Sequence, residues 1–216
     1  LGGKANEGQE NEYVTQEAVF TKKGVDRVMK YAFELALKRN SRLTSATKSN
    51  GIIHTMTYWD DRFNEISKDY TQVETSQYHI DILCAHFVQH PDWFDVVVAS
   101  NLFGDILSDL GPAVVGGIGI AAGGNINPEK HYPSMFEPVH GSAPDIAGQN
   151  IANPIACFWT AAMMLDHLNE QESALLLMDA IEFLTSNSKV LTKDLGGRAS
   201  TTEVTNELIR IIKNWN

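Results

Sequence analysis

Apolar and polar positions follow two periodicities along the first hundred residues, one typical of helices and one typical of strands. Between Thr21 and Lys38 apolar side chains recur at helical spacing, and Thr21 is placed to cap that helix. The same periodicities predict helices over about 51–68 and 80–89, and strands over 42–47, 73–78 and 95–99. Helices that alternate with strands indicate an α/β fold with a largely parallel sheet.

The rest of the chain has a looser pattern. Residues 1–12 are expected to form a loop or arm, and residues 12–20 an extended segment. The Gly-rich stretch 111–124 is expected to cross between two lobes, and 125–150 to be loop. Helices follow over 151–187, where two are expected, and over about 202–214. Few strands are expected after residue 124. Part of the sheet of this second lobe must therefore come from a segment outside the sequence or from another chain.

Composition and charge narrow the class of protein. Hydrophobic residues make up 43% and charged residues 20%, which is ordinary for a globular chain. The 27 acidic against 17 basic residues give a net charge of −10, which disfavours nucleic acid as a partner and favours a divalent cation. No apolar run approaches the roughly 18 residues of a membrane span. Cys84 and Cys157 are too few and too far apart for a disulfide framework, so a cytoplasmic location is expected.

Two acidic residues follow the Val-rich strand. Asp105 and Asp109 are four positions apart, so a helix places both carboxylates on one face, where they repel each other. A cation between them would relieve that repulsion, and carboxylate oxygens suit Mg²⁺ or Mn²⁺. The alternative is a pair of solvated helix acids.

Lys48 comes directly after the strand 42–47, a usual place for a catalytic group in an α/β protein. A lysine there can act as general base towards a hydroxyl, although a solvated loop lysine is the simpler interpretation.

The loop Phe136–Gly148 combines histidine, serine and aspartate with small turn residues just before a helix. A ligand could lie against its backbone amides, and Asp145 could accept hydrogen bonds from a ribose diol, which favours NAD over NADP. A purely structural loop remains the alternative. The nearby segment Gly117–Ala122 matches GxGxxA, but no strand precedes it and no βαβ unit follows, so we do not interpret it as a dinucleotide-binding fingerprint.

Two long stretches resemble one known family. SNLFGDILSD (Ser100–Asp109) and HGSAPDIAGQNIAN (His140–Asn153) are similar to signatures of the metal-dependent β-decarboxylating dehydrogenases, which include isocitrate and isopropylmalate dehydrogenases. The resemblance extends over essentially the whole chain. Within the family, TSATKSNG (Thr44–Gly51) resembles the tartrate/D-malate branch more than the isopropylmalate branch.

The resemblance implies a two-lobe fold and a role for each lobe. Residues 1–115 would form the dimerisation and metal/substrate lobe, and 116–216 part of the NAD-binding lobe. Lys48 would be the catalytic general base, with Mg²⁺ or Mn²⁺ on Asp105 and Asp109. Asp81 would reach the metal of the partner subunit's site, so a homodimer would share its active sites. The implied cofactor contacts are Asn50 near the nicotinamide and, around the NAD pocket, Glu137, His140, Gly141, Ser142, Ala143, Asp145 and Asn153.

The implied reaction is NAD-dependent oxidation of a small 2-hydroxy diacid, such as tartrate or D-malate, followed by loss of CO₂. In the family a tyrosine acid, the arginines that bind the substrate carboxylates and several strands lie upstream of the position of Leu1. The chain therefore resembles the C-terminal part of such an enzyme, incomplete in its N-terminal strands and inactive alone. The alternatives are an isopropylmalate or isocitrate dehydrogenase, or a truncated, non-catalytic dimerising or regulatory subunit.

Overall fold

The computed structural model describes residues 1–215. The chain divides into two compact units at Asp105 and Ile106, called here the N-terminal unit and the C-terminal unit. The division falls within helix α4 (Asn101–Val115), earlier than the boundary expected after residue 115. The roles expected for the two lobes stay predictions.

The N-terminal unit is built on a parallel sheet of three strands in the order β4-β3-β5. These strands are β3 (Arg42–Thr47), β4 (Glu74–His79) and β5 (Val96–Val98). The central strand β3 is buried from Leu43 to Thr47 and pairs with β4 along its whole length, from Arg42 opposite Glu74 to Thr47 opposite His79. All three strands predicted in this unit are confirmed.

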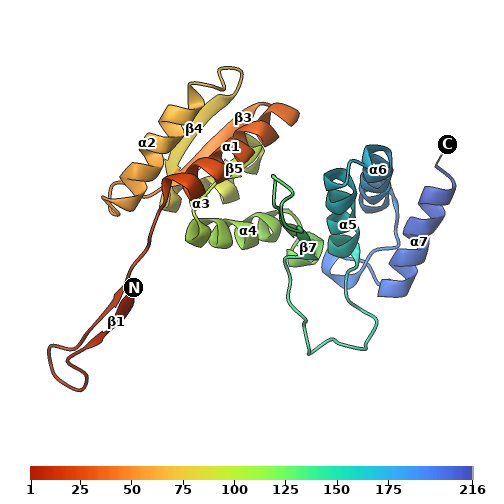
Figure 1. Ribbon diagram of the computed structural model, residues 1–216. Coiled ribbons are helices and arrows are strands. Elements are labelled where there is room, and N and C mark those ends of the chain that lie inside the picture. Colours follow the sequence, from red (N-terminus) through yellow and green to blue (C-terminus); the bar gives the residue numbers. More distant parts are fainter. Residues whose placement is uncertain (216) are drawn as a thin grey trace. The chain divides into compact units, whose positions relative to one another are not determined.

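Three helices accompany this sheet, as predicted: α1 (Lys22–Lys38), α2 (Thr55–Ser67) and α3 (Ile80–Gln89). Helices α1 and α2 pack on each other and on β3, and α3 contacts β3 and β4 (Figure 1). Their apolar faces supply the fully buried side chains of Met29, Phe33, Trp59 and Phe63. The Thr21 hydroxyl caps α1 by accepting from Gly24 N at 3.1 Å, as its position predicted.

Helix α2 begins at Thr55, later than the predicted start near residue 51. The amides of Gly51 and Ile52 both donate to the Lys48 carbonyl, at 3.0 and 2.8 Å, so a tight turn separates strand β3 from the helix. The apolar pattern could not reveal this turn, because Ile52 and Ile53 continue the helical spacing although both are exposed.

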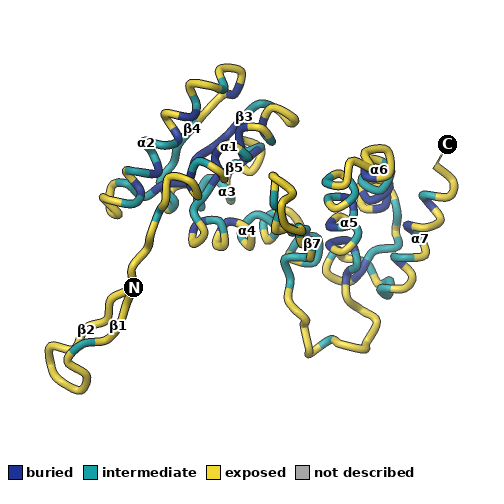
Figure 2. Tube along the Cα trace, viewed as in Figure 1, coloured by how far each residue is buried: buried dark blue, intermediate teal, exposed yellow. Residues whose placement is uncertain are grey.

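A hairpin precedes α1. Strands β1 (Gly2–Ala5) and β2 (Tyr13–Gln16) pair in antiparallel register, with Gly2 opposite Gln16. Nearly every residue of the hairpin is exposed, as Figure 2 shows. The expectation of a loop or arm over residues 1–12 did not include strand β1, whose Gly, Lys and Ala residues carry little strand signal, whereas β2 lies in the segment that was expected to be extended.

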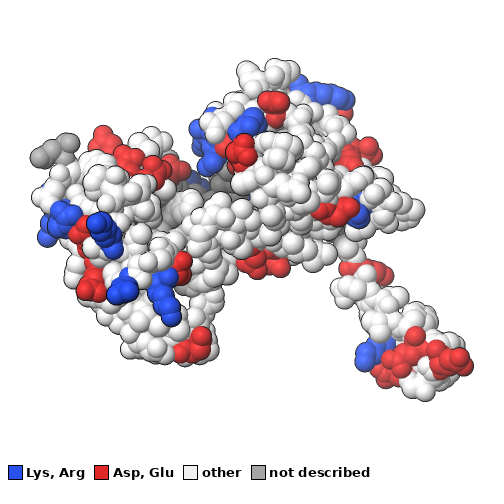
Figure 3. All heavy atoms as spheres, turned by 180° about the vertical axis from the view of Figure 1, so that it is seen from behind, with Lys and Arg blue, Asp and Glu red and all other residues white. Residues whose placement is uncertain are grey.

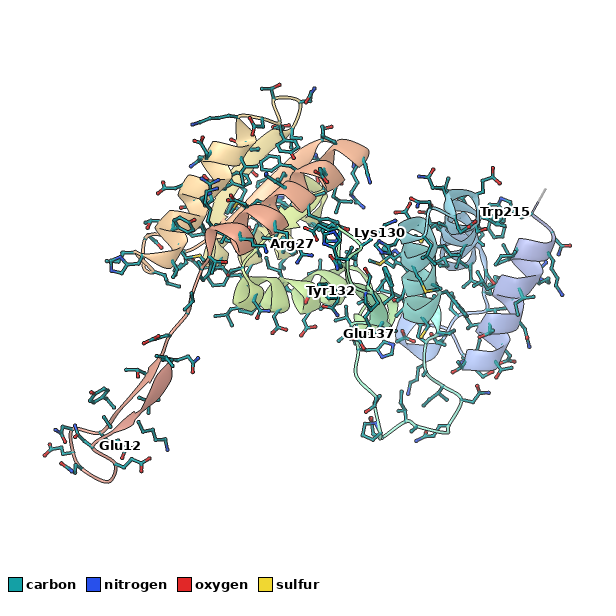
Figure 4. The ribbon with its side chains drawn as sticks, in the orientation of Figure 1. Glu12, Arg27, Lys130, Tyr132, Glu137 and Trp215 are labelled. Carbon is teal, nitrogen blue, oxygen red and sulfur yellow. The ribbon has the colours of Figure 1, made fainter. Side chains whose placement is uncertain are left out.

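The C-terminal unit is mainly helical. Helices α5 (Ile155–His167), α6 (Gln171–Asn187) and α7 (Thr201–Lys213) enclose a core that includes Ile181, Leu184 and Leu208. Helix α7 starts with a capping box, in which Ser200 Oγ accepts from Glu203 N and Ser200 N donates to Glu203. Trp215, labelled in Figure 4, packs edge-to-face against Phe183 of α6, with ring centroids 5.9 Å apart.

A second hairpin lies where a crossover between lobes and a loop were expected. Strands β6 (Ala122–Asn125) and β7 (Met135–Pro138) pair in antiparallel register and pack against α5. Helix α4 also continues through Pro112 to Val115, so much of the expected Gly-rich crossover is regular structure. Short 3₁₀ turns complete the chain, namely η1 (Pro91–Trp93), η2 (Ile118–Ile120) and η3 (Lys193–Leu195).

Charged side chains of both signs are spread over the face shown in Figure 3, without a large cluster of Lys and Arg in that view. Among the residues that the structure describes, no helix is long and apolar enough to cross a membrane.

Candidate active site

Strand order places Lys48 and Asp81 together. Lys48 is the first residue after β3, and Asp81 is the second residue of α3, which follows β4. Because β3 and β4 run parallel, with Thr47 opposite His79, both residues leave the sheet at the same edge. Lys48 Nζ lies 2.7 Å from Asp81 Oδ1 and donates a hydrogen bond to it.

This ion pair is open to solvent on the aspartate side. The Asp81 side chain is 66% exposed and the Lys48 side chain 30% exposed. The hydrogen bond from Lys48, aided by one from the backbone amide of Asp81, holds the pKa of Asp81 below its ordinary value. Asp81 is thus a carboxylate with one oxygen on the lysine, in a position that a ligand can reach.

Asp105 and Asp109 both lie on α4, so their spacing puts them on one helix face, and both are exposed. Their oxygen donors fit Mg²⁺ or Mn²⁺, which take carboxylate oxygens together with water and substrate. Within the described part of a single chain, however, no three His, Cys, Asp or Glu side chains come together as a metal cluster. The role of Asp81, Asp105 and Asp109 as a metal site stays a prediction.

The C-terminal unit contains a cavity of about 1250 Å³. Its lining comes from five stretches of the chain: 116–119, residues 140–143 and 146–148 of one loop, 150–153, Lys193 with Asp194, and Thr201. Its volume is somewhat above the usual range for small-molecule sites. A cavity of this size is large enough for much of a dinucleotide.

The loop that follows β7 shapes one wall through its backbone. Ile146 N donates to the Ala143 carbonyl at 3.1 Å, and Gln149 N donates to the Ile146 carbonyl at 3.2 Å. Ala143 has a positive φ of 41°, which marks a tight turn. Turns of small residues leave room for a ligand to approach the backbone, and this fits the nucleotide part of NAD.

Most residues predicted for the NAD pocket lie at this cavity. Those in its lining are His140, Gly141, Ser142, Ala143 and Asn153. Glu137 is an exposed residue of β7 (Figure 4) and Asp145 an exposed residue of the loop, and neither is in the lining. Asn50, also exposed, belongs to the N-terminal unit. The cofactor role of each of these residues stays a prediction.

Sequence reasoning missed two parts of the wall. The segment Gly116–Gly119 lacks the βαβ context of a dinucleotide fingerprint, as predicted, yet it lines the cavity. Its Gly117 has a φ of 109°, which side-chain-bearing residues rarely adopt. The other missed part is Lys193 and Asp194 in η3, where the following Gly196-Gly197 pair was the available sign of a functional turn.

Comparison with known proteins decides the family. The chain matches the isocitrate/isopropylmalate dehydrogenase family over residues 2–208. It belongs to that family. The same family has solved structures with this fold: isocitrate dehydrogenase from Methylococcus capsulatus (33% identity, TM-score 0.88) and a β-decarboxylating dehydrogenase from Thermococcus kodakarensis (35% identity, TM-score 0.85). They cover 99% of this chain, which in turn covers 63% and 61% of theirs.

Curated relatives in the family are more similar in sequence. A probable tartrate dehydrogenase/decarboxylase of Bacillus subtilis is 55% identical over 96% of the chain, and a decarboxylating D-malate dehydrogenase of Escherichia coli is 55% identical over 98%. A tartrate dehydrogenase/decarboxylase of Pseudomonas putida is 54% identical over 94%. The chain spans only 58–60% of the length of these three relatives. The predicted family and fold class are thereby confirmed.

Proposed function

We propose that this chain is part of a dehydrogenase that oxidises a small 2-hydroxy diacid of the tartrate or D-malate type and removes CO₂ from the product. The names of the relatives at 54–55% identity support this substrate class. The observation that carries the proposal is the pairing of Lys48 with Asp81 at the ends of two parallel strands, 2.7 Å apart. It places a proton-accepting group beside a carboxylate that can bind a cation.

Lys48 is the proposed general base. Oxidation of the substrate hydroxyl requires removal of the O–H proton as the carbon-bound hydrogen leaves with its electron pair. When bound, the nicotinamide accepts that pair, and the divalent cation holds the 2-hydroxy acid and stabilises the charge that develops on its oxygens. Lys48 Nζ takes the hydroxyl proton. A base can accept this proton only in its neutral form.

Asp105, Asp109 and Asp81 are the proposed holders of Mg²⁺ or Mn²⁺. In this proposal Asp81 reaches the metal of a partner subunit in a homodimer, as the resemblance to the family implies. Since Lys48 and Asp81 of one subunit are in hydrogen-bond contact, the active site that receives Asp81 from a partner subunit also receives Lys48, the general base.

The cavity of the C-terminal unit is the proposed site for NAD. Its lining of turns and small residues leaves backbone groups accessible to the ribose and phosphate parts of the cofactor. The exposed Asp145, in the same loop, is the proposed acceptor for the ribose hydroxyls and repels a 2′-phosphate.

A substrate panel with the full-length protein tests the function. We expect NADH formation with D-malate or a tartrate in the presence of Mn²⁺, trapping of CO₂, and loss of activity in EDTA that added Mn²⁺ restores. NADP should be a poorer acceptor than NAD. A full-length protein that oxidises none of the 2-hydroxy diacids would contradict the proposal and favour a dimerising subunit without catalysis.

Isocitrate or isopropylmalate oxidation is the second candidate, favoured by the match to isocitrate dehydrogenase at a TM-score of 0.88. The same panel separates the two, because these substrates differ from D-malate chiefly in the group at the neighbouring carbon. A higher kcat/KM for isocitrate or isopropylmalate than for D-malate and the tartrates would select the second candidate.

A further inference from the structure

Three segments that are distant in the sequence meet at one point of the cavity wall. Asn153 precedes α5, Asp194 lies in η3, and Gly119 lies in η2. Asn153 Nδ2 donates to Asp194 Oδ2 at 2.8 Å. A Cβ atom on Gly119 would stand 2.9 Å from the same Asp194 oxygen and 3.2 Å from Asn153 Cβ, so a side chain there would displace the Asp194 carboxylate.

The Asn153 side chain is held at both ends. Its Oδ1 accepts from the backbone amide of Ile155 at 3.0 Å, at the start of α5, while its Nδ2 donates to Asp194. Asn153 itself is buried, whereas Asp194 is exposed and lines the cavity. The side-chain oxygen and nitrogen of Asn153 are therefore both engaged within the wall.

The other end of the wall segment 150–153, at Asn150, is hydrogen-bonded to the start of α7. Asn150, with a φ of 58°, accepts through its carbonyl from Thr201 N at 2.9 Å. Its side-chain oxygen accepts from the Thr202 hydroxyl at 2.9 Å. Residues 150–153 are thus attached at both ends to residues 194–202, by the Asp194 contact and by the two threonines.

We propose that Asp194 is a positioning residue of the cofactor cavity, which it shapes by holding Asn153 and, through it, the wall segment 150–153. This inference rests on the proposed NAD site. It gives residue 194 a role in cofactor affinity without a role in the proton and hydride steps, because the contact acts on the wall of the cavity.

The pair can be reversed without changing its shape. The variant Asn153→Asp keeps an oxygen to accept from Ile155 N but sets two carboxylates against each other. The double variant Asn153→Asp with Asp194→Asn restores one donor and one acceptor with the roles exchanged. A hydrogen bond to a charged group is typically worth enough to change a binding constant by about tenfold or more.

Calorimetric titration of NAD⁺ into the full-length protein is the test, with KM and kcat as a second readout. We expect Asn153→Asp to raise the Kd and the KM for NAD⁺ by about tenfold at little cost in kcat, and the double variant to return both to within about threefold of wild type. Asp194→Ala, which removes the acceptor altogether, should resemble Asn153→Asp. Asp179→Asn, on the exposed side of α6, is the matched control and should change nothing.

The outcomes separate this inference from the function on which it rests. A wild-type protein that binds neither NAD⁺ nor NADP⁺ overturns the proposed cofactor site and the inference with it. Tight NAD⁺ binding by wild type, with a double variant no better than Asn153→Asp alone, overturns the inference only. A loss of kcat at unchanged NAD⁺ affinity in Asp194→Ala, with the melting temperature preserved, also overturns it.

Discussion

In the N-terminal unit the candidate site consists of charged side chains at the ends of strands, whereas in the C-terminal unit the candidate cavity is walled largely by turns. Lys48 and Asp81 hold each other 2.7 Å apart, on a sheet whose central strand is buried. The cavity wall depends instead on glycines and on hydrogen bonds between loops. Chemistry that moves a proton needs one particular side chain, while a nucleotide cavity needs space and backbone groups.

This difference predicts different sensitivities to substitution. In the N-terminal unit a single charged residue should control the rate. In the C-terminal unit single changes should alter affinity or local stability more than the rate.

The largest expected effect is on catalysis. Lys48→Met in the full-length protein should lower kcat by about 10²- to 10⁴-fold, the usual contribution of a general base, with unfolding unchanged. Steady-state kinetics across the substrate panel measure it. The control is Lys68→Met, which breaks an exposed ion pair with Glu65 on the same unit. A loss below about threefold would mean that Lys48 is not the base.

The next largest effects should come from substitutions in the hydrophobic cores of the two units. Phe33 is fully buried and stacks on Phe63 and Tyr70, with centroids 5.4 and 4.8 Å apart, so Phe33→Ala should lower the free energy of unfolding by about 4 kcal/mol. Leu184→Ala, in the core of the C-terminal unit, should cost about 3 kcal/mol. Urea unfolding measures both, and Leu175→Ala, which is 63% exposed, is the control.

Hydrogen exchange then tests whether the two cores are independent. Each core substitution should increase amide exchange mainly within its own unit. Equal loss of protection in α1 and α6 after Phe33→Ala would show that the two units unfold as one. The two units would then not differ in their sensitivity to core substitutions.

A smaller effect concerns the ion pair between α1 and α2. Burial raises the pKa of Asp26, but the hydrogen bonds from Arg62 and Lys22 outweigh it, and the net shift is downward. A lowered carboxylate pKa stabilises the fold above the unfolded-state pKa near 4, and that stabilisation is lost as the pH falls through the folded-state pKa. Asp26→Asn should cost about 1 to 2 kcal/mol at neutral pH and flatten the loss of stability in acid.

Urea unfolding from neutral pH down through pH 4 measures this slope, with Asp61→Asn, exposed on α2, as the control. An unchanged slope in Asp26→Asn would mean that other carboxylates carry the acid sensitivity. Asp95 is the next residue to test, because its side chain is only 1% exposed and accepts from Arg39 and Asn40.

The smallest effect should come from the capping box of α7. Ser200→Ala removes the acceptor for Glu203 N and should cost about 1 kcal/mol. Ser186→Ala, exposed in the last turn of α6, should be neutral. Thermal unfolding of the two variants gives the comparison. Equal melting temperatures would mean that the interhelical core, rather than the cap, fixes the start of α7.

Much of this molecule could be predicted wherever local pattern and chemistry coincide. The helices α1, α3 and α7 and the strands β3, β4 and β5 follow from the spacing of apolar residues, because that spacing decides which face is buried. The family follows from two long motifs, and its confirmation extends over residues 2–208. The carboxylates of Asp105 and Asp109 share a helix face by spacing alone.

Tertiary structure alone decided the rest. No spacing rule places Lys48 against Asp81, 33 positions away, since their contact depends on the parallel register of β3 and β4. The pairing of β1 with β2 and of β6 with β7 was missed because β1 and β6 are short and rich in Gly, and such strands pair only when a partner strand is present. Likewise Gly119, Asn153 and Asp194 meet only in the folded chain. Local sequence determines which side chains are buried, but long-range packing determines which of them meet.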